Sequence, residues 1–162
     1  MSVDNPLLAA WDTPHGLPPF GALQPAHFEP ALRQAMAQQR EELAAIAANP
    51  APPDFDNTVA AFDRAGRLLA RVSATFYNLT ASETSPALQQ VQRQLTPVLA
   101  AHSSAVYMHA GLFARVDALH AQRQSLGLSG EALRLLERVH LDFVRAGAKL
   151  EPAAQQRYAG VM

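Results

Sequence analysis

The chain has 162 residues, of which 49% are hydrophobic and 17% are charged, and its formal net charge is −1. This length suits one domain that buries roughly 70% of the surface exposed by its unfolded chain. Lys149 is the only lysine and the arginines are scattered, so no basic stripe is available for nucleic acid. The sequence contains no cysteine, which excludes disulfides and thiolate chemistry and fits a reducing compartment.

The low share of charged residues has two explanations. Alanine is abundant and favours helices, so it raises the share of hydrophobic residues. Alternatively, part of the apolar surface meets further protein. Composition alone leaves both open.

The sequence shows no membrane segment. The first 16 residues lack the basic region and long apolar run of a signal peptide. Residues 94–114 contain no charged side chain, but Gln94, Thr96, Pro97 and pairs of His and Ser interrupt them. This stretch predicts a buried helix and not a membrane span. We expect a soluble, cytoplasmic protein without membrane or nucleic-acid partners.

Residues 1–26 form a Pro-rich arm. Its prolines exclude a regular helix there: Pro6, Pro14, Pro18, Pro19 and Pro25. The arm also contains large apolar residues: Trp11, Leu17, Phe20 and Leu23. We expect it to pack on a helical core; recognition as a Pro-rich ligand is the alternative.

Helical periodicity dominates the rest of the chain. The first helix is predicted from about His27 to Ala48, with Pro30 tolerated in its first turn. The stretch 54–80 opens with a turn, and Asp56 or Asn57 is the expected N-cap. The apolar stripe that follows predicts one continuous central helix of roughly 20 residues, about 30 Å long. Four more are expected at about 86–108, 110–124, 130–146 and from Pro152 onward.

Cap residues support these boundaries. Ser85 followed by Pro86 is typical of a helix start, Ser129 is a good N-cap, and Gly147 suits the position after a helix. Pro97 predicts a kink near residues 93–97. No strand signal appears. The fold class is therefore all-α, a bundle or array of about six helices, with domains expected at 1–26 (the arm) and 27–162 (the helical domain).

The histidines do not form a zinc motif. They are His15, His27, His102, His109, His120 and His140. No two are four residues apart and none precedes a glutamate, so H-E-x-x-H is absent. His102 and His109 are seven apart and could share a helix face, but ordinary helix histidines are the favoured interpretation.

Other polar groups have ordinary explanations. The candidates are Glu41 with Glu42, Asp54 with Asp56, Ser103 with Ser104, the tyrosines Tyr77, Tyr107 and Tyr158, and the run Arg64, Arg67 and Arg71. Capping, packing with the hydroxyl at the rim, and a solvated helix face account for them. We therefore predict no catalytic, cofactor-binding or metal-binding residue in the chain.

A resemblance to a known family rests on five sequence segments that occur in the same order: NPLL (5–8), LPPFGALQPAHFEPAL (17–32), NPAPPDFDNTVAAFDRAGRLLARVSATFYNLT (49–80), HSSAVYMHAGLFARV (102–116) and LLERVHLDFVRAGAKL (135–150). Together they resemble the N-terminal part of an M3-family zinc oligopeptidase. Among its branches, the bacterial peptidyl-dipeptidases (dipeptidyl carboxypeptidases) are the most similar. The resemblance covers nearly the whole chain.

The resemblance implies a helical clamshell around a deep channel for short unfolded peptides. In that family a helical H-E-x-x-H supplies two zinc ligands and the general base, a later Glu supplies the third ligand, and peptidyl-dipeptidases release C-terminal dipeptides. That apparatus lies far downstream and is absent from these 162 residues. No catalytic or metal role therefore passes to any residue of this chain.

The resulting hypothesis is an N-terminal, channel-wall segment of such a peptidase, with its last helix truncated and without activity alone. Zinc is expected only in the full-length protein. The expected partners are the missing catalytic part and short peptides, and the isolated segment is expected to self-associate through apolar surface. The alternative is a free-standing helical module that binds peptides or a partner protein. A reading frame that continues past Met162 into H-E-x-x-H would favour the first hypothesis.

Overall fold

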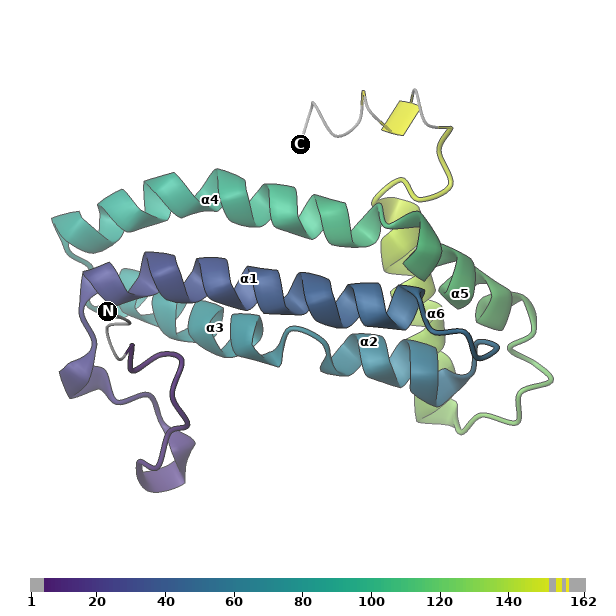
Figure 1. The fold of residues 1–162 in the computed structure, drawn as a ribbon, viewed down its shortest axis with the longest axis horizontal. Helices are drawn as coiled ribbons and strands as arrows, with labels where there is room; N and C mark the ends of the chain where they lie inside the picture. The colour runs from purple at the N-terminus through teal and green to yellow at the C-terminus, as the bar shows by residue number, and fades with distance from the viewer. Residues whose placement is uncertain (1–4, 152–153, 156, 158–162) are drawn as a thin grey trace. The chain divides into compact units, whose positions relative to one another are not determined.

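The computed structural model describes residues 5–151, 154–155 and 157. Within this part of the chain, α-helices and short 3-10 or π-helical turns are the only regular elements, and no strand occurs (Figure 1). The predicted all-α fold class is thus confirmed. The helix predicted from Pro152 falls largely outside the described residues.

Seven helical segments between residues 25 and 145 make up most of the described part of the chain. Their bounds are α1 (Pro25–Ala47), the π-helical segment η3 (Phe55–Ala60), α2 (Ala61–Arg64), α3 (Arg67–Ser82), α4 (Pro86–Tyr107), α5 (Ala110–Ala121) and α6 (Gly130–Arg145). The arm before α1 contains two 3-10 turns, η1 (Pro14–Gly16) and η2 (Phe20–Ala22). None of the described helices is both long enough and apolar enough to cross a lipid bilayer.

The predicted continuous helix through residues 54–80 is wrong. The chain breaks between α2 and α3, where Ala65 is extended (φ −66°, ψ 140°) and Gly66 is left-handed (φ 77°, ψ 20°). A left-handed residue ends an α-helix, and glycine adopts that conformation without a Cβ penalty. The first half of this stretch also begins as a π-helix, a rare form.

Several predicted caps are confirmed, and one is corrected. The hydroxyl oxygens of Ser85 and Ser129 accept backbone N–H groups at the starts of α4 and α6. Gly147 (φ 94°) follows α6 in a Schellman arrangement. At η3, however, the N-cap is Asp54, which accepts the Asn57 N–H at 2.7 Å.

Helix α4 continues through Pro97, and the kink predicted near residues 93–97 stays a prediction. Both Arg93 and Pro97 are exposed, so water can solvate the carbonyl that lacks its helical donor. The helix is also not buried on all sides: only Leu88, Leu95, His102 and Val106 are buried. The prediction of a buried helix over residues 94–114 therefore holds for one face only.

The chain divides into two compact units, each with its own apolar core. The first combines the chain up to Gln39 with Gly66–Leu99, and it joins the N-terminal part of α1, α3 and the start of α4. Its buried core comprises Leu7, Phe28, Ala31, Leu32, Val72, Phe76, Leu88 and Leu95. Leu7 belongs to the arm, so the arm contributes to this core.

The second unit combines Arg40–Ala65 with the chain from Ala100 onward. It contains the end of α1, η3, α2, the end of α4, α5 and α6. Its buried core comprises Leu43, Ile46, Val59, Val106, Leu112, Val116, Leu119, Leu136, Val139 and Phe143. Helices α5 and α6 pack against each other and against η3.

Candidate functional site

The arginine run predicted on one helix is divided between two helices. Arg64 ends α2, whereas Arg67 and Arg71 belong to α3 after the break at Gly66. These helices also belong to different compact units. The run therefore does not form one basic helix face.

Arg71 holds the arm against α3 within the first unit. Its guanidinium lies over the indole of Trp11, with Cζ 4.5 Å from the ring centroid. Its Nη2 donates to the carbonyl oxygens of Leu7 at 2.9 Å and Ala9 at 3.1 Å. A planar guanidinium can lie flat on an aromatic ring while its N–H groups donate in its own plane, a geometry that the ammonium of lysine lacks. The contacts of Arg71 are therefore those of a structural residue.

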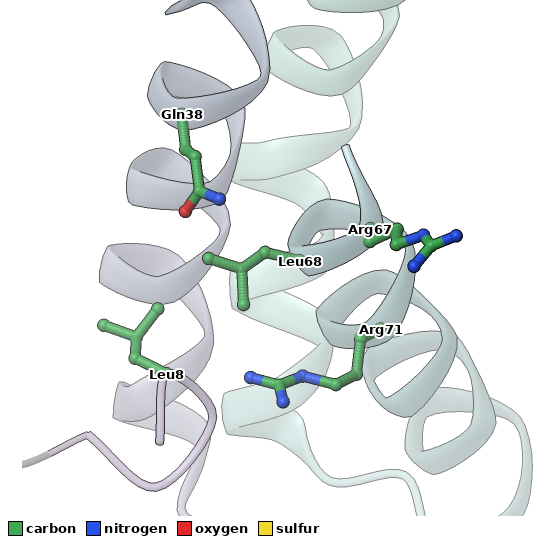
Figure 2. A pocket seen from close by; sticks show the side chains of 5 residues that line it. All are labelled: Leu8, Gln38, Arg67, Leu68 and Arg71. Carbon is green, nitrogen blue, oxygen red and sulfur yellow. The ribbon is translucent and has the colours of Figure 1, made fainter. Parts of the chain in front are cut away.

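A pocket of about 320 Å³ lies beside this contact and is lined by Leu8, Gln38, Arg67, Leu68 and Arg71 (Figure 2). In the close-up, the Arg67 side chain points away from Gln38 and Leu68, while Arg71 points toward the arm. A ligand site needs a few polar groups that converge. This pocket does not provide them, because Arg71 is already bonded to the arm.

A second pocket, of about 250 Å³, lies within the second unit. It is lined by Arg40, Leu43, His102, Ala105, Val106 and His109. His102 is inside α4 and His109 is the N-cap of α5, so they do not share a helix. The pocket nevertheless brings them together. Burial, and then the charge of Arg40, lowers the pKa of His102 below its usual value of 6.5.

The second unit also contains a pair of histidines that the sequence did not indicate. The rings of His120 on α5 and His140 on α6 are stacked, with centroids 3.7 Å apart and planes within 2°. His140 Nε2 lies 2.8 Å from Asp117 Oδ1, which Lys149 Nζ also approaches at 3.3 Å. Phe113 also stacks on His140, with ring centroids 6.0 Å apart. The cluster links α5, α6 and the residues after α6.

Two groups of this cluster, His120 and Asp117, have lowered pKa values. Burial, and then the charge of His140, lowers the pKa of His120. The hydrogen bond with His140 is the largest cause that lowers the pKa of Asp117. The fold therefore favours a neutral His120 beside an ionised Asp117.

The described residues do not fit a zinc ion. Among them, no three His, Asp or Glu side chains gather where they could hold a metal. The His120 and His140 rings are parallel, and the Nε2 of His140 is directed at Asp117. Zinc sites instead need three or four nitrogen, sulfur or oxygen ligands that converge tetrahedrally.

The tyrosine candidates differ in their surroundings. Tyr77 is 46% exposed, and Tyr158 lies outside the described residues. Tyr107 packs edge-on against Phe62 and Phe143, with centroids 6.2 and 5.3 Å away. Burial is the largest cause that raises the pKa of Tyr107. Tyr107 is thus part of an aromatic cluster.

The carboxylate and serine candidates do not form a site. Asp54 caps η3, which is the structural role predicted for this pair. Glu41 is exposed on α1, and Ser103 is exposed on α4 next to the buried His102. Neighbouring residues on a helix point in different directions, so Ser103 and His102 do not face each other.

Arg115 is an important residue that sequence reasoning missed. It is 8% exposed, and its Nη1 donates to the carbonyl oxygens of Asn49 (2.9 Å) and Ala51 (3.2 Å). Its Nη2 donates to Asn57 Oδ1 at 2.8 Å, and its Nε to Thr58 Oγ1 at 3.3 Å. Arg115 thereby ties α5 to η3 and to the turn that precedes it. Its place at a core-facing position of an apolar helix was the one signal that pointed to it.

Comparison with known proteins identifies the relatives of this chain. It is 43% identical over 153 residues to dipeptidyl carboxypeptidase of Escherichia coli K12, covering 94% of this chain and 22% of that protein. It is 43% identical over 146 residues to dipeptidyl carboxypeptidase of Salmonella typhimurium, covering 90% of this chain and 22% of the relative. Oligopeptidase A of Salmonella typhimurium is 29% identical over 157 residues, which cover 97% of this chain and 22% of that relative.

No family model matches the chain. The chain spans about a fifth of the length of the curated relatives that it matches. The sequence identity to the dipeptidyl carboxypeptidases is higher than to oligopeptidase A, as the five sequence segments indicated. The chain is therefore a homologue of the M3 peptidases dipeptidyl carboxypeptidase and oligopeptidase A.

Proposed function

We propose that the chain is the N-terminal helical part of a zinc metallopeptidase that removes dipeptides from the C-termini of short peptides. The observation that carries this proposal is the 43% identity to Escherichia coli dipeptidyl carboxypeptidase over 94% of the chain. Because the match covers only 22% of that relative, most of such a peptidase would lie outside these 162 residues.

In this proposal the segment forms one wall of the peptide channel and carries no catalytic residue. The zinc-binding H-E-x-x-H expected of the family does not occur in the sequence, and the described histidines do not converge. The segment would restrict access and orient peptides for a catalytic centre elsewhere. Alone, it would be inactive.

The proposed organisation is an arm, residues 1–26, packed on a helical part, residues 27–162. The arm supplies Leu7 to the first core, and the Asn5 side chain donates to the His27 carbonyl at 2.8 Å. The Arg71 contacts with Leu7, Ala9 and Trp11 support the same organisation.

The proposed partners are the catalytic part of the peptidase and short peptides. A cytoplasmic location is part of the proposal and fits a chain without cysteine. Exposed apolar side chains, such as Leu17 (54% exposed) and Phe20 (46%), would favour self-association of the isolated segment.

An assay of the purified chain tests the lack of activity. The chain, with zinc added, is incubated with a short peptide that has a free C-terminus, and dipeptide release is followed by mass spectrometry. Escherichia coli dipeptidyl carboxypeptidase is the positive control. We expect no release by the chain; release that requires zinc and stops with a chelator would contradict the proposal and support an enzyme complete in itself.

A further inference from the structure

The pocket between α1, α4 and the start of α5 combines donors with an apolar lining. Arg40 contributes a guanidinium, and His109 contributes an imidazole. Leu43 and Val106 are 3% and 9% exposed and belong to the second core. None of the six lining residues is acidic. The pocket is therefore suited to an anion that also carries an apolar group.

His109 lines the pocket and is the N-cap of α5, and the capping contact sets its tautomer. Its Nδ1 accepts the backbone N–H of Leu112 at 3.3 Å. A neutral imidazole has one acceptor and one donor nitrogen, so accepting at Nδ1 places the proton on Nε2. Gly111 keeps this side chain close, since a Cβ there would lie 3.3 Å from His109 Cε1. The cap thus fixes both the tautomer and the position of the ring.

Arg40 supplies the positive charge of the pocket. Arg40 lines the pocket beside His102, and its charge contributes to the lowered pKa of His102. Among the described residues, no carboxylate forms an ion pair with Arg40. A guanidinium binds carboxylates through charge-assisted, often bidentate hydrogen bonds.

The size of the pocket limits the ligand. Sites for drug-sized ligands span ~300–1,000 Å³. At about 250 Å³, this pocket admits a group of the size of one amino-acid residue. Its apolar side is built from short aliphatic side chains, Leu43, Ala105 and Val106.

We propose that the pocket binds a small carboxylate with a short branched apolar group, with Arg40 and His109 Nε2 donating to the carboxylate and Leu43 and Val106 contacting the apolar group. Such a ligand is either a free acid or the C-terminal residue of a peptide. The site is independent of the proposed peptidase function.

The test is an NMR titration of the isotope-labelled full chain with 4-methylpentanoate, which represents a free acid, and with N-acetyl-leucine, which represents a peptide end. We expect saturable shifts at the amides of residues 40–43 and 102–112, and weaker binding of the neutral 4-methylpentanamide and of acetate. Tighter binding of N-acetyl-leucine would identify the peptide end as the ligand, and tighter binding of 4-methylpentanoate would identify the free acid.

Three variants make the test specific. Arg40→Gln should weaken binding about tenfold or more, since hydrogen bonds to charged groups are the strong ones. His109→Asn keeps a side chain that caps helices but lacks the Nε2 donor, so it should weaken binding without loss of thermal stability. Arg134→Gln, an exposed arginine on α6 in the same unit, is the matched control and should bind as the wild type does. Absence of saturable shifts, equal binding of the amide, or unchanged binding by both site variants would overturn the proposal.

Discussion

His120 lies face to face with His140, with ring centroids 3.7 Å apart and ring planes within 2°. Two imidazoles at this distance repel each other if both are protonated. The stack therefore connects the packing of α5 on α6 to the protonation of His120, whose pKa is lowered.

This arrangement predicts that acid weakens the fold. The folded-state pKa values of His120 and His102 are lowered from 6.5, so the unfolded chain binds more protons below that pH. The contribution of these two histidines to the free energy of unfolding is complete above about pH 6.5. It is lost as the pH falls from there toward the lowered pKa values. The lowered pKa of Asp117 adds a further loss below its usual 3.8. The measurement is the free energy of unfolding by denaturant between about pH 7.5 and about pH 5.

A variant isolates the contribution of the stack. His120→Phe keeps an aromatic ring on His140 but does not titrate, so its stability should fall less steeply over the same pH range. His15→Gln, at an exposed position, should retain the wild-type slope. Equal slopes for His120→Phe and the wild type would show that the stack does not contribute.

The break at Gly66 predicts a large effect of one methyl group. In Gly66→Ala, the left-handed backbone strains the new residue, and its Cβ would lie 2.2 Å from Gln39 Nε2. We expect a loss of about 2–3 kcal/mol in the free energy of unfolding. Gly127→Ala is the matched control: it has φ +62° and no atom within 4 Å of the added Cβ. Its loss should be only about 1 kcal/mol, from backbone strain alone. If both variants lose the same amount, the Gln39 contact is unimportant.

Arg115 should be the most costly arginine to replace. Arg115→Met removes the donors that pair with Asn49, Ala51 and Asn57, and leaves these acceptors partly buried. We expect a loss of about 3 kcal/mol, and Arg115→Lys should recover little because it lacks the planar fork. Chemical denaturation measures the effect, with Arg134→Met as the exposed control. Wild-type stability of Arg115→Met would remove the proposed link between α5 and the turn before η3.

Arg71 should control the docking of the arm. Arg71→Ala removes the stacking on Trp11 and the donors to Leu7 and Ala9, so amide exchange at residues 7–11 should accelerate. Arg67→Ala, four residues away on α3 with a side chain that points away from the arm, is the matched control (Figure 2). Hydrogen exchange read by mass spectrometry distinguishes the two. Equal protection in both variants would mean that Leu7 burial alone holds the arm.

The sequence predicted the local features of the fold well, because periodicity and capping are local. Ser85, Ser129 and Gly147 mark helix ends through their own backbone and side-chain chemistry. The break at Gly66 was missed because an isolated glycine within an apolar period is compatible with a continuing helix. Gly66 is left-handed, and a Cβ built on it would approach Gln39, a residue distant in sequence that no local pattern places there.

The pockets and clusters could not be predicted, because they depend on the register between helices. His120 and His140 are 20 residues apart and meet only through the way α6 packs on α5. The seven-residue spacing of His102 and His109 is compatible with one shared helix face, but α4 ends at Tyr107, between the two residues. The role of Arg115 could not be read from its core-facing position alone, because its four acceptors come from residues 49–58, far from it in sequence.

A chimera gives the most direct test of the proposed function. The segment of Escherichia coli dipeptidyl carboxypeptidase that matches this chain is replaced by the 162 residues, and release of C-terminal dipeptides is measured beside the parent enzyme and a deletion that lacks the segment. We predict that the chimera releases dipeptides at a rate within about tenfold of the parent, whereas the deletion is inactive. A chimera as inactive as the deletion would contradict the assignment of this chain to such a peptidase.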